Sequence, residues 1–352
     1  MPPPNPNPPE FPVLEDLKVG VIGLGMGKRH SRAYHEIPGV RLVAVCDVDA
    51  ERADRVARDL GTETATTDWQ ELCDLGLDLV SVCSPDHLHH RMAKAAMEGG
   101  AHVLCEKPMT TTREDAEDLV RTAERTGRKL AVGNVNRFVP QIRAVHDLVA
   151  KGRLGELFMV EANYIHDMRN VYVRTPWRID PDIPQNPWIA GASHAMDLVR
   201  WLGGDIDEIM LYDNHVAGTP AELPDHAISM LRFASGCLGR VWLNKGLRRW
   251  PEHIVQLGAY GSEGTALTDT EGMHVTAWLD PEIGGQMGPI VIPFQPTIGH
   301  PVVEELTAFV GNILDDTAPL VDGRAGAATI AALCVGLDSA ASGKPEKVRP
   351  IE

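Results

Sequence analysis

The sequence predicts an α/β protein with a doubly wound parallel sheet at its N-terminal end, followed by an α/β domain with a large, mostly antiparallel open sheet. In the first part of the chain, short β-branched runs alternate with segments of helical periodicity. Beyond residue 151 the strand-like runs become longer and are joined by hairpin turns. The length of 352 residues suits two domains, each with its own apolar core.

The first part of the chain supplies the elements of the parallel sheet. Strands are expected at residues 18–23, 41–46, 79–83, 102–105 and 129–132. Helices are expected at residues 50–60, 88–98 and 113–126, between those strands. Continuous apolar strands that alternate with amphipathic helices predict a parallel sheet covered by helices on both faces.

The second part begins after a helix expected near residues 140–151. Residues 226–233 and 237–243 form a hairpin around Ser235-Gly236, and further strands are expected at residues 253–258, 265–268 and 274–279. Helices near residues 194–202, 303–314 and 325–340 are expected to cover one face of this sheet. The predicted division is a flexible Pro-rich tail at 1–16, a first domain at 17–137 and a second at 138–352.

Composition excludes several classes of partner. The 33 basic and 49 acidic side chains leave a net charge of −16, which repels nucleic-acid backbones and anionic membranes. The N-terminus has neither the basic nor the apolar segment of a secretory signal, and no stretch of about 20 apolar residues is expected to span a bilayer. The six cysteines lack CxxC spacing, so we expect buried thiols in a cytoplasmic protein and no metal site.

A glycine turn follows the first expected strand. Gly23-Leu24-Gly25-Met26-Gly27 joins that strand to a helix, where glycine lets a dinucleotide pyrophosphate approach backbone N–H groups. The spacing is one residue shorter than GxGxxG. Asp47, 22 residues after Gly25 at the end of the second strand, suits a ribose 2′-hydroxyl and predicts NAD rather than NADP. Arg52 or Arg55 leaves NADP possible.

Two polar segments follow the third and fourth expected strands. The first is Ser84-Pro85-Asp86-His87-Leu88-His89, and the second is Glu106-Lys107-Pro108. Both lie at the carboxyl edge of the predicted sheet, where open α/β folds bind their ligands.

With these motifs the chain resembles the Gfo/Idh/MocA family of oxidoreductases from Leu17 to Val348. The resemblance also includes Asn136-Arg137-Phe138, Trp177-Arg178, His194 to Asp197, Arg200-Trp201-Leu202 and Gly261 to Thr265. It implies a Rossmann domain and association into dimers or tetramers through the sheet of the second domain. The cofactor contacts that we expect are Gly23, Leu24, Gly25, Met26, Gly27, Asp47, Ser84, Pro85, His87, His89, Glu106 and Lys107.

The resemblance implies two catalytic residues. Lys107 is expected beside the nicotinamide and the substrate hydroxyl, with Lys107-Pro108 as a cis peptide. An ammonium there stabilises charge on an alkoxide, and His194, expected at the start of a helix, exchanges the hydroxyl proton. The chain departs from a common family pattern because Ala190 replaces an aspartate four residues before this histidine and Ala192 replaces a glycine. Asp197 is expected to hold the helix or orient an arginine.

Substrate contacts are expected in the loop of residues 166–188, which is rich in arginine and tryptophan. Forked donors and flat rings suit the hydroxyls and the C–H faces of a sugar. The expected substrate-binding residues are Lys107, Trp177, Arg178, His194, His166 and Arg169. The alternative for half of the loop's residues is that they only anchor the loop. Its arginines also fit a carboxylated or nucleotide-linked sugar.

Three functions fit these features. The first is an NAD(P)-dependent dehydrogenase or reductase that acts on a secondary hydroxyl or keto group of a sugar, inositol or glycoside. The second is a redox-neutral enzyme of the glycosidase or epimerase type, which oxidises and re-reduces one sugar. The third is a catalytically silent ligand sensor of the same fold. Intact Glu106-Lys107-Pro108 and His194 favour an enzyme.

Overall fold

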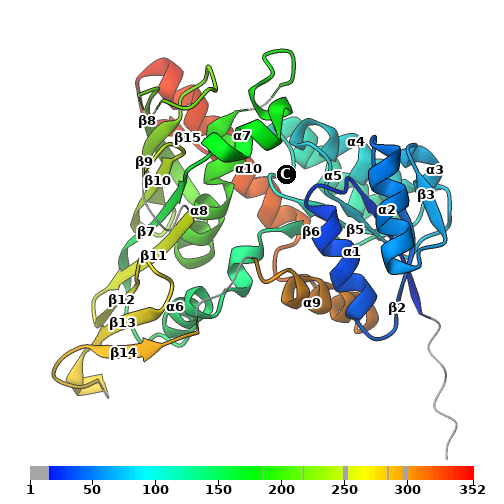
Figure 1. Cartoon of the computed structure of the whole chain (residues 1–352). Helices are drawn as coiled ribbons and strands as arrows, with labels where there is room; N and C mark the ends of the chain where they lie inside the picture. Colours follow the sequence, from blue (N-terminus) through cyan, green and yellow to red (C-terminus); the bar gives the residue numbers. More distant parts are fainter. Residues whose placement is uncertain (1–15, 185, 217, 249–252, 284, 296–299) are drawn as a thin grey trace, which may run out of the picture.

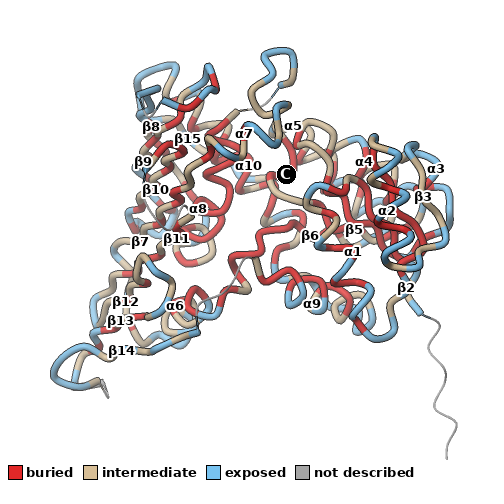
Figure 2. Tube along the Cα trace, viewed as in Figure 1, coloured by how far each residue is buried: buried red, intermediate tan, exposed pale blue. Residues whose placement is uncertain are grey.

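The computed structural model describes residues 16–184, 186–216, 218–248, 253–283, 285–295 and 300–352. The predicted tail lies outside the described residues except for Asp16. Figure 1 shows two lobes, with the first sheet and its helices in blue and cyan and most of the second sheet in green and yellow. Figure 2 shows that buried residues follow the strands of both sheets and the helix faces turned toward them.

The first sheet has six parallel strands in the order β3-β2-β1-β4-β5-β6, as expected for a doubly wound fold. Its strands are β1 (Leu17–Ile22), β2 (Val40–Cys46), β3 (Thr64–Thr66), β4 (Leu79–Val82), β5 (His102–Glu106) and β6 (Leu130–Gly133). Strand order reverses between β1 and β4, so the glycine turn and the segment that begins at Ser84 lie at the switch point where such sheets bind ligands.

Helices and short 3-10 turns connect these strands. They are α1 (Gly27–Glu36), α2 (Ala50–Leu60), α3 (Trp69–Cys73), η1 (Asp86–Leu88), α4 (His89–Glu98), α5 (Arg113–Thr126) and η2 (Val135–Phe138). Helix α2 shows why the boundaries were predictable: the Asp49 side chain accepts a hydrogen bond from the Arg52 N–H, and Gly61 ends the helix with φ +68°. Strand β3 and helix α3 were not predicted because each is too short to show a period.

The second sheet has nine strands in the order β14-β13-β12-β11-β7-β10-β9-β8-β15. They are β7 (Leu157–His166), β8 (Ile206–Asn214), β9 (His226–Phe233), β10 (Leu238–Asn244), β11 (His253–Gly261), β12 (Gly264–Thr268), β13 (His274–Leu279), β14 (Ile290–Pro293) and β15 (Glu346–Lys347). Strands β7 and β10 run parallel, and the other described pairs are antiparallel, which confirms the mostly antiparallel prediction.

The central strand β7 was missing from the predicted elements. It pairs with β10 on one side and β11 on the other. Its signal was present in the sequence, because buried Val160, Ala162 and Tyr164 alternate with Glu161 and Asn163. The strand ends at His166, so the predicted substrate loop starts at the C-terminal end of β7.

The remaining helices and turns are α6 (Pro140–Ala150), α7 (Arg169–Arg174), η3 (Pro176–Ile179), α8 (Pro187–Gly203), η4 (Pro281–Ile283), α9 (Val302–Leu314) and α10 (Gly323–Ser342). Helix α8 starts earlier than predicted, so His194 lies in its middle rather than at its start. The start signal was Asn186-Pro187: Asn186 accepts a hydrogen bond from the Trp188 N–H, and Pro187 occupies the first turn.

The expected position of the helix at residues 303–314 was wrong. Helix α9 packs against α1 of the first lobe rather than on the second sheet. Leu306, Phe309 and Val310 share an apolar cluster with Val21 and Tyr34. An amphipathic period shows that a helix has an apolar face, but it does not show which apolar surface covers that face.

Helix α10 alone among the described helices is long and apolar enough to cross a membrane by length and composition. It is a core helix in this fold, because it packs against α5, α8 and β8. Figure 1 shows it, in red, between the two sheets. This packing accounts for its hydropathy. From the sequence we expect no apolar stretch of about 20 residues, whereas α10 reaches that length and hydropathy.

We propose that the boundary between the domains lies at residues 137/138, within η2. The chain leaves β6 there and enters α6, which packs beside β11, β12 and β13. Helix α9 then returns to the first domain, and Val132 of β6 donates its N–H to the Val321 carbonyl. Residues that follow the boundary in the sequence therefore pack against α1 and β6 of the first domain.

Candidate active site

The glycine turn after β1 packs tightly on one side and is open on the other. Gly23 has φ +86°, and a Cβ there would lie 2.7 Å from the backbone of Cys83 and Ser84, so only glycine fits. A Cβ at Gly25 would meet nothing within 4 Å. Gly27 starts helix α1. The turn therefore offers an open space at a helix N-terminus, where a pyrophosphate would be stabilised by backbone N–H groups.

Asp47 lies beside this turn at the end of β2. It is buried, and its Oδ2 accepts a hydrogen bond of 2.6 Å from the Leu24 N–H. Arg52 Nη1 lies 3.1 and 3.2 Å from the two carboxylate oxygens. The Arg52 side chain is half-exposed, whereas the Asp47 side chain is only 5% exposed. The donor and acceptor set fits a dinucleotide.

The two polar segments after β4 and β5 lie next to each other because these strands are parallel neighbours. His89 is buried between them, with Nδ1 2.8 Å from the Pro108 carbonyl and Nε2 2.8 Å from the Ser84 carbonyl. The Lys107-Pro108 peptide is cis, as the resemblance implied. His89 thus positions the two loops, and a direct contact between it and the cofactor stays a prediction.

Glu106 is held next to Lys107 by a network within the first domain. His30 Nε2 lies 3.1 Å from its Oε1, and the Lys107 N–H donates to its Oε2 at 3.0 Å. Burial opposes ionisation of Glu106, but the His30 hydrogen bond and the nearby charges of His30 and Lys107 outweigh burial and lower its pKa to about 2. The Glu106 carboxylate therefore stays negatively charged next to Lys107.

His194 projects from the middle of α8 and is 2% exposed. Burial lowers its pKa well below the usual value, and the charge of Lys107 lowers it further. Its Nδ1 has no hydrogen-bond partner among the described residues, and Ala190 and Ala192 supply none. His194 is therefore a neutral imidazole, and the effect of Lys107 on its pKa indicates that the Lys107 amine lies near the ring.

Four other rings surround His194, and three of them were missing from the predicted site. Tyr164 and His166 come from β7, His253 comes from the start of β11, and His300 precedes α9. The centroid of His194 lies 5.4 Å from Tyr164 and 6.3 Å from His300, while His253 lies 5.0 Å from both Tyr164 and His166. Burial lowers the pKa of His166 to about 4 and that of His253 to about 3, so the imidazoles are neutral.

No group of three or more potential ligands among the described residues has the arrangement of a metal site. The His166 and His253 rings offer neutral nitrogen donors and acceptors and flat surfaces. Such groups suit a ligand rich in hydroxyls.

A second lysine, Lys245, was also missing from the predicted site. It follows β10 and is 3% exposed. Burial lowers its pKa to about 7, and the charges of Arg178 and Lys107 contribute to this shift. The sequence signal was a lysine that continues the inward positions of Val241 and Leu243.

The loop after β7 brings Arg178 and Trp177 to the first domain. Arg178 Nη1 lies 3.7 Å from Asp86 Oδ2, and the guanidinium carbon lies 4.2 Å from the centre of the Trp177 ring. Trp177 in turn lies 6.5 Å from the ring of His87. These two predicted substrate residues therefore face the segment that follows β4.

Two other polar residues of the second domain have structural partners. Arg169, predicted as a substrate contact, pairs with Asp167 and donates to the Gly246 carbonyl at 3.2 Å, so it anchors its own loop. Asp197 accepts hydrogen bonds of 2.8 Å from Nε and Nη2 of Arg137, and both side chains are buried. Asp197 therefore orients an arginine, as expected.

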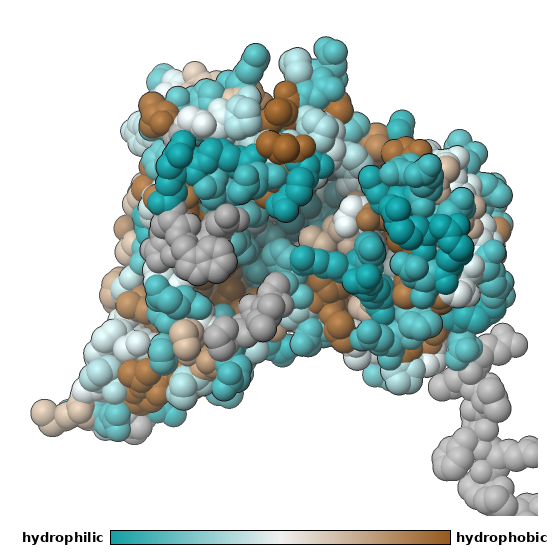
Figure 3. Space-filling model, in the orientation of Figure 1, coloured by the Kyte–Doolittle hydropathy of each residue, from teal (hydrophilic) through white to brown (hydrophobic). Residues whose placement is uncertain are grey.

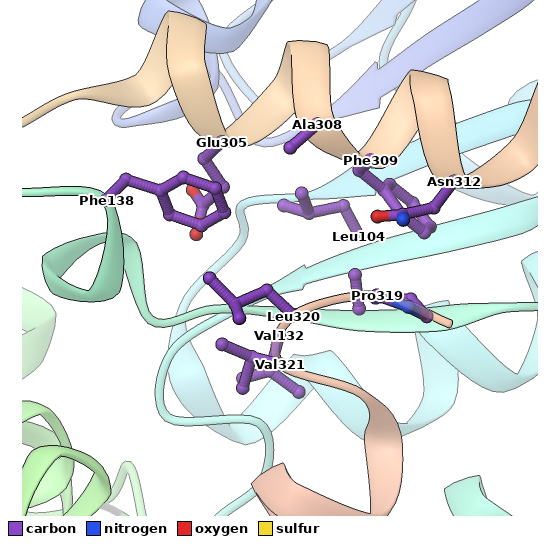
Figure 4. Close-up of a pocket in the computed structure, with 11 residues that line it drawn as sticks. Leu104, Val132, Phe138, Glu305, Ala308, Phe309, Asn312, Pro319, Leu320 and Val321 are labelled. Carbon is purple, nitrogen blue, oxygen red and sulfur yellow. The ribbon is translucent and has the colours of Figure 1, made fainter. Parts of the chain in front are cut away.

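Figure 3 shows the surface hollowed between the two lobes, with hydrophilic residues around the hollow. A separate small cavity lies between α9 and the first sheet and is lined mainly by apolar side chains, among them Leu104, Phe138 and Phe309. Figure 4 shows Glu305 beside this cavity. Because Lys107 and His194 are not among its lining residues, this cavity is not the candidate active site.

Both parts of the chain match a known family of oxidoreductases. Residues 17–134 match the model of an oxidoreductase family with an NAD-binding Rossmann fold, and residues 142–267 match the Gfo/Idh/MocA C-terminal domain. The chain is 27% identical to levoglucosan dehydrogenase of Pseudarthrobacter phenanthrenivorans, over 73% of this chain and 75% of that protein. It is 26% identical to myo-inositol 2-dehydrogenase of Thermotoga maritima, over 88% and 92%.

A solved structure of levoglucosan dehydrogenase in complex with NADH and levoglucosan has the same fold. Its TM-score to this chain is 0.86, at 22% sequence identity, with 96% of this chain and 100% of that chain covered.

Proposed function

Because the chain belongs to the Gfo/Idh/MocA family of NAD-binding oxidoreductases, we propose that it transfers a hydride between NAD and a secondary hydroxyl or keto group of a sugar, inositol or glycoside. The observation that carries this proposal is that polar side chains of both domains meet in one place: Arg178 Nη1 lies 3.7 Å from Asp86 Oδ2, and the charge of Lys107 lowers the pKa of His194. The names of the relatives, levoglucosan and inositol dehydrogenases, support a polyol substrate.

The open glycine turn and Asp47 would hold the cofactor. Gly25 leaves room for the pyrophosphate next to the N-terminus of α1, and the Asp47 carboxylate would accept a hydrogen bond from a ribose hydroxyl. NAD is favoured over NADP because Asp47 would repel a 2′-phosphate. When bound, NAD accepts or returns the hydride.

His194 would exchange the proton of the substrate hydroxyl, and Lys107 would stabilise the charge on its oxygen. As the C–H electron pair leaves with the hydride, the O–H bond breaks, its proton passes to the neutral His194, and the carbonyl forms. Burial keeps the His194 ring unprotonated before the reaction. The Lys107 ammonium would stabilise negative charge on the oxygen, and Glu106 would hold that ammonium. Reduction runs through the same steps in reverse.

Around the reacting carbon, Trp177, Arg178 and His166 would bind the rest of the substrate. The Trp177 ring offers a flat face, and Arg178 and His166 offer N–H donors. Arg169 is left out of this set because its guanidinium is engaged by Asp167 and by the Gly246 carbonyl.

We also propose a homodimer or homotetramer that forms through the open face of the second sheet. Tyr212, Met230, Leu238 and Trp278 are exposed and alternate with buried residues on β8, β9, β10 and β13. Light scattering should give a mass of at least two chains.

All six cysteines are free and five of them are buried, which supports a cytoplasmic location.

The test of the function is NAD reduction with a panel of sugars, inositols and glycosides. Lys107→Met and His194→Gln should each lower kcat by at least about 10²-fold while NADH affinity is retained. The exposed residues Lys151 and His35 provide matched controls, Lys151→Met and His35→Gln, which should leave kcat unchanged. Full activity in either site variant would refute the assigned role. Product formation without net NAD reduction would select the redox-neutral alternative instead.

A further inference from the structure

The Lys245 side chain has a fixed position in the site. Its backbone N–H donates to the Asp225 carbonyl and its carbonyl accepts from the Met168 N–H, both at 2.9 Å. The side chain then lies against helix α8: a Cβ at Gly191 would lie 2.6 Å from Lys245 Cε and 3.2 Å from Nζ. The amine therefore sits beside α8 one turn before His194.

No carboxylate in the described part of the chain pairs with this amine. The residues that precede His194 on α8, Ala190, Gly191, Ala192 and Ser193, carry no charge. Glu106 is already engaged by His30 and by the Lys107 N–H. A buried ammonium without a partner is costly, so this position favours either loss of the proton or the arrival of an anion.

The cationic side chains around Lys245 outnumber the carboxylates by one. Lys107, Arg178 and Lys245 are three cationic side chains, and the two carboxylates among them are Asp86 and Glu106. Asp86 acts on both lysines and also lies 3.7 Å from Arg178, and its buried Oδ2 has no hydrogen-bond partner in the described part of the chain. Asp86 is therefore the one carboxylate of the two that acts on all three cations.

We propose, building on the dehydrogenase function proposed above, that the physiological substrate is a polyol that carries a carboxylate, bound by Lys245 and Arg178. A carboxylate brings the single negative charge that the site lacks, whereas a phosphate ester brings about −1.5 to −2. The planar guanidinium of Arg178 matches a carboxylate in geometry, and Lys245 adds a point charge. The neutral imidazoles of His166 and His253 remain available for hydroxyl groups.

The test compares matched ligands that differ only in CH₂OH against COO⁻: glucose with glucuronate, galactose with galacturonate, and glucitol with gluconate. Binding to the enzyme loaded with NADH is measured by calorimetry, and oxidation is measured with NAD. In at least one pair the acid should bind at least about tenfold more tightly than its neutral partner. Higher salt should weaken this preference only slightly, because the charges are buried.

The variant Lys245→Met keeps the length and the apolar contacts of the side chain and removes the charge. It should reduce the preference for the acid to less than about threefold and leave NADH affinity intact, which also reports that the variant folds. Lys151→Met is the matched control on an exposed lysine and should keep the preference.

Three outcomes are decisive. Tighter binding of the neutral member in every pair, with oxidation of neutral polyols, would overturn the carboxylate proposal and leave the dehydrogenase function standing. An acid preference that survives in Lys245→Met would also overturn the role given to Lys245. If NADH binds but no member of any pair binds or is oxidised, the proposed function itself fails.

Discussion

The guanidinium of Arg178 lies 3.7 Å from the Asp86 carboxylate, so a residue from the loop after β7 reaches the end of β4 in the other domain. This ion pair joins the proposed cofactor side of the site to the proposed substrate side. Because it is only partly exposed, solvent screens it less than a surface pair. A substitution in this ion pair should therefore affect substrate affinity more than cofactor affinity.

We expect Arg178→Ala to raise KM for the substrate at least about tenfold, because it removes a forked donor and leaves Asp86 without its cation. The NADH dissociation constant should change much less. Steady-state kinetics and NADH fluorescence titration check the two effects separately. Arg174→Ala, an exposed arginine of the same loop, is the control. An equal loss of NADH and substrate affinity in Arg178→Ala would contradict this assignment.

Asp47→Asn should shift cofactor preference. The neutral amide no longer repels a 2′-phosphate, so the ratio of kcat/KM for NAD to that for NADP should fall at least about tenfold. Measuring both cofactors at one substrate concentration gives the ratio. Asp49→Asn is a close control, because Asp49 also contacts Arg52, with 3.2 Å between Oδ2 and Nη2. A similar shift in both variants would show that Arg52, rather than the Asp47 charge, sets the preference.

Binding of a carboxylated substrate should weaken as pH rises above about 7. The pKa of the Lys245 amine in the empty site is about 7, so above this pH it must take up a proton before it can pair with a carboxylate. The charged groups that face it are Arg178, Lys107 and Asp86, and the neighbouring His166 has a pKa of about 4 and stays neutral.

Affinity should fall by up to about tenfold per pH unit, with proton uptake visible by calorimetry in buffers of different ionisation enthalpy. The charge of Lys107, whose pKa is also lowered by burial, changes in the same direction. Comparison with Lys245→Met separates the two amines: the part of the slope that belongs to Lys245 should vanish in the variant. An unchanged slope would assign the titration to Lys107.

Glu305 should make the protein less stable as pH rises. It is buried on α9, both carboxylate oxygens lack a hydrogen-bond partner among the described residues, and burial raises its pKa well above 4.5. The folded state therefore keeps a proton that the unfolded state loses, so stability is fully present below about pH 4.5 and falls as pH rises toward the folded-state pKa.

Glu305→Gln removes this titration and should be more stable than the wild type at pH 8 by ~1–3 kcal/mol, with little difference at low pH. Urea unfolding across the pH range measures it. The adjacent exposed residue gives the control, Glu304→Gln, which should follow the wild-type curve. Parallel curves for wild type and Glu305→Gln would show that Glu305 is ionised in the folded protein.

Several features could be predicted from the sequence because they depend on neighbours in the chain. The Gly23 to Gly27 turn and the parallel direction of β1, β4 and β5 follow from local motifs and periodicity, and the family resemblance implied the cis Lys107-Pro108 peptide. Asn186-Pro187 and the alternation in β7 were equally local signals, and they would have corrected the start of α8 and supplied the missing strand.

The sequence by itself determined which residues turn, alternate or begin a helix, because backbone sterics and the helix and strand periods act over a few residues. Only the tertiary structure decided that α9 packs on α1 and that His253, His300 and Lys245 join His194. These contacts link distant segments through the register of the nine-stranded sheet and the packing of apolar faces. A local pattern shows that such a face exists, but the partner that covers it is set by the whole fold.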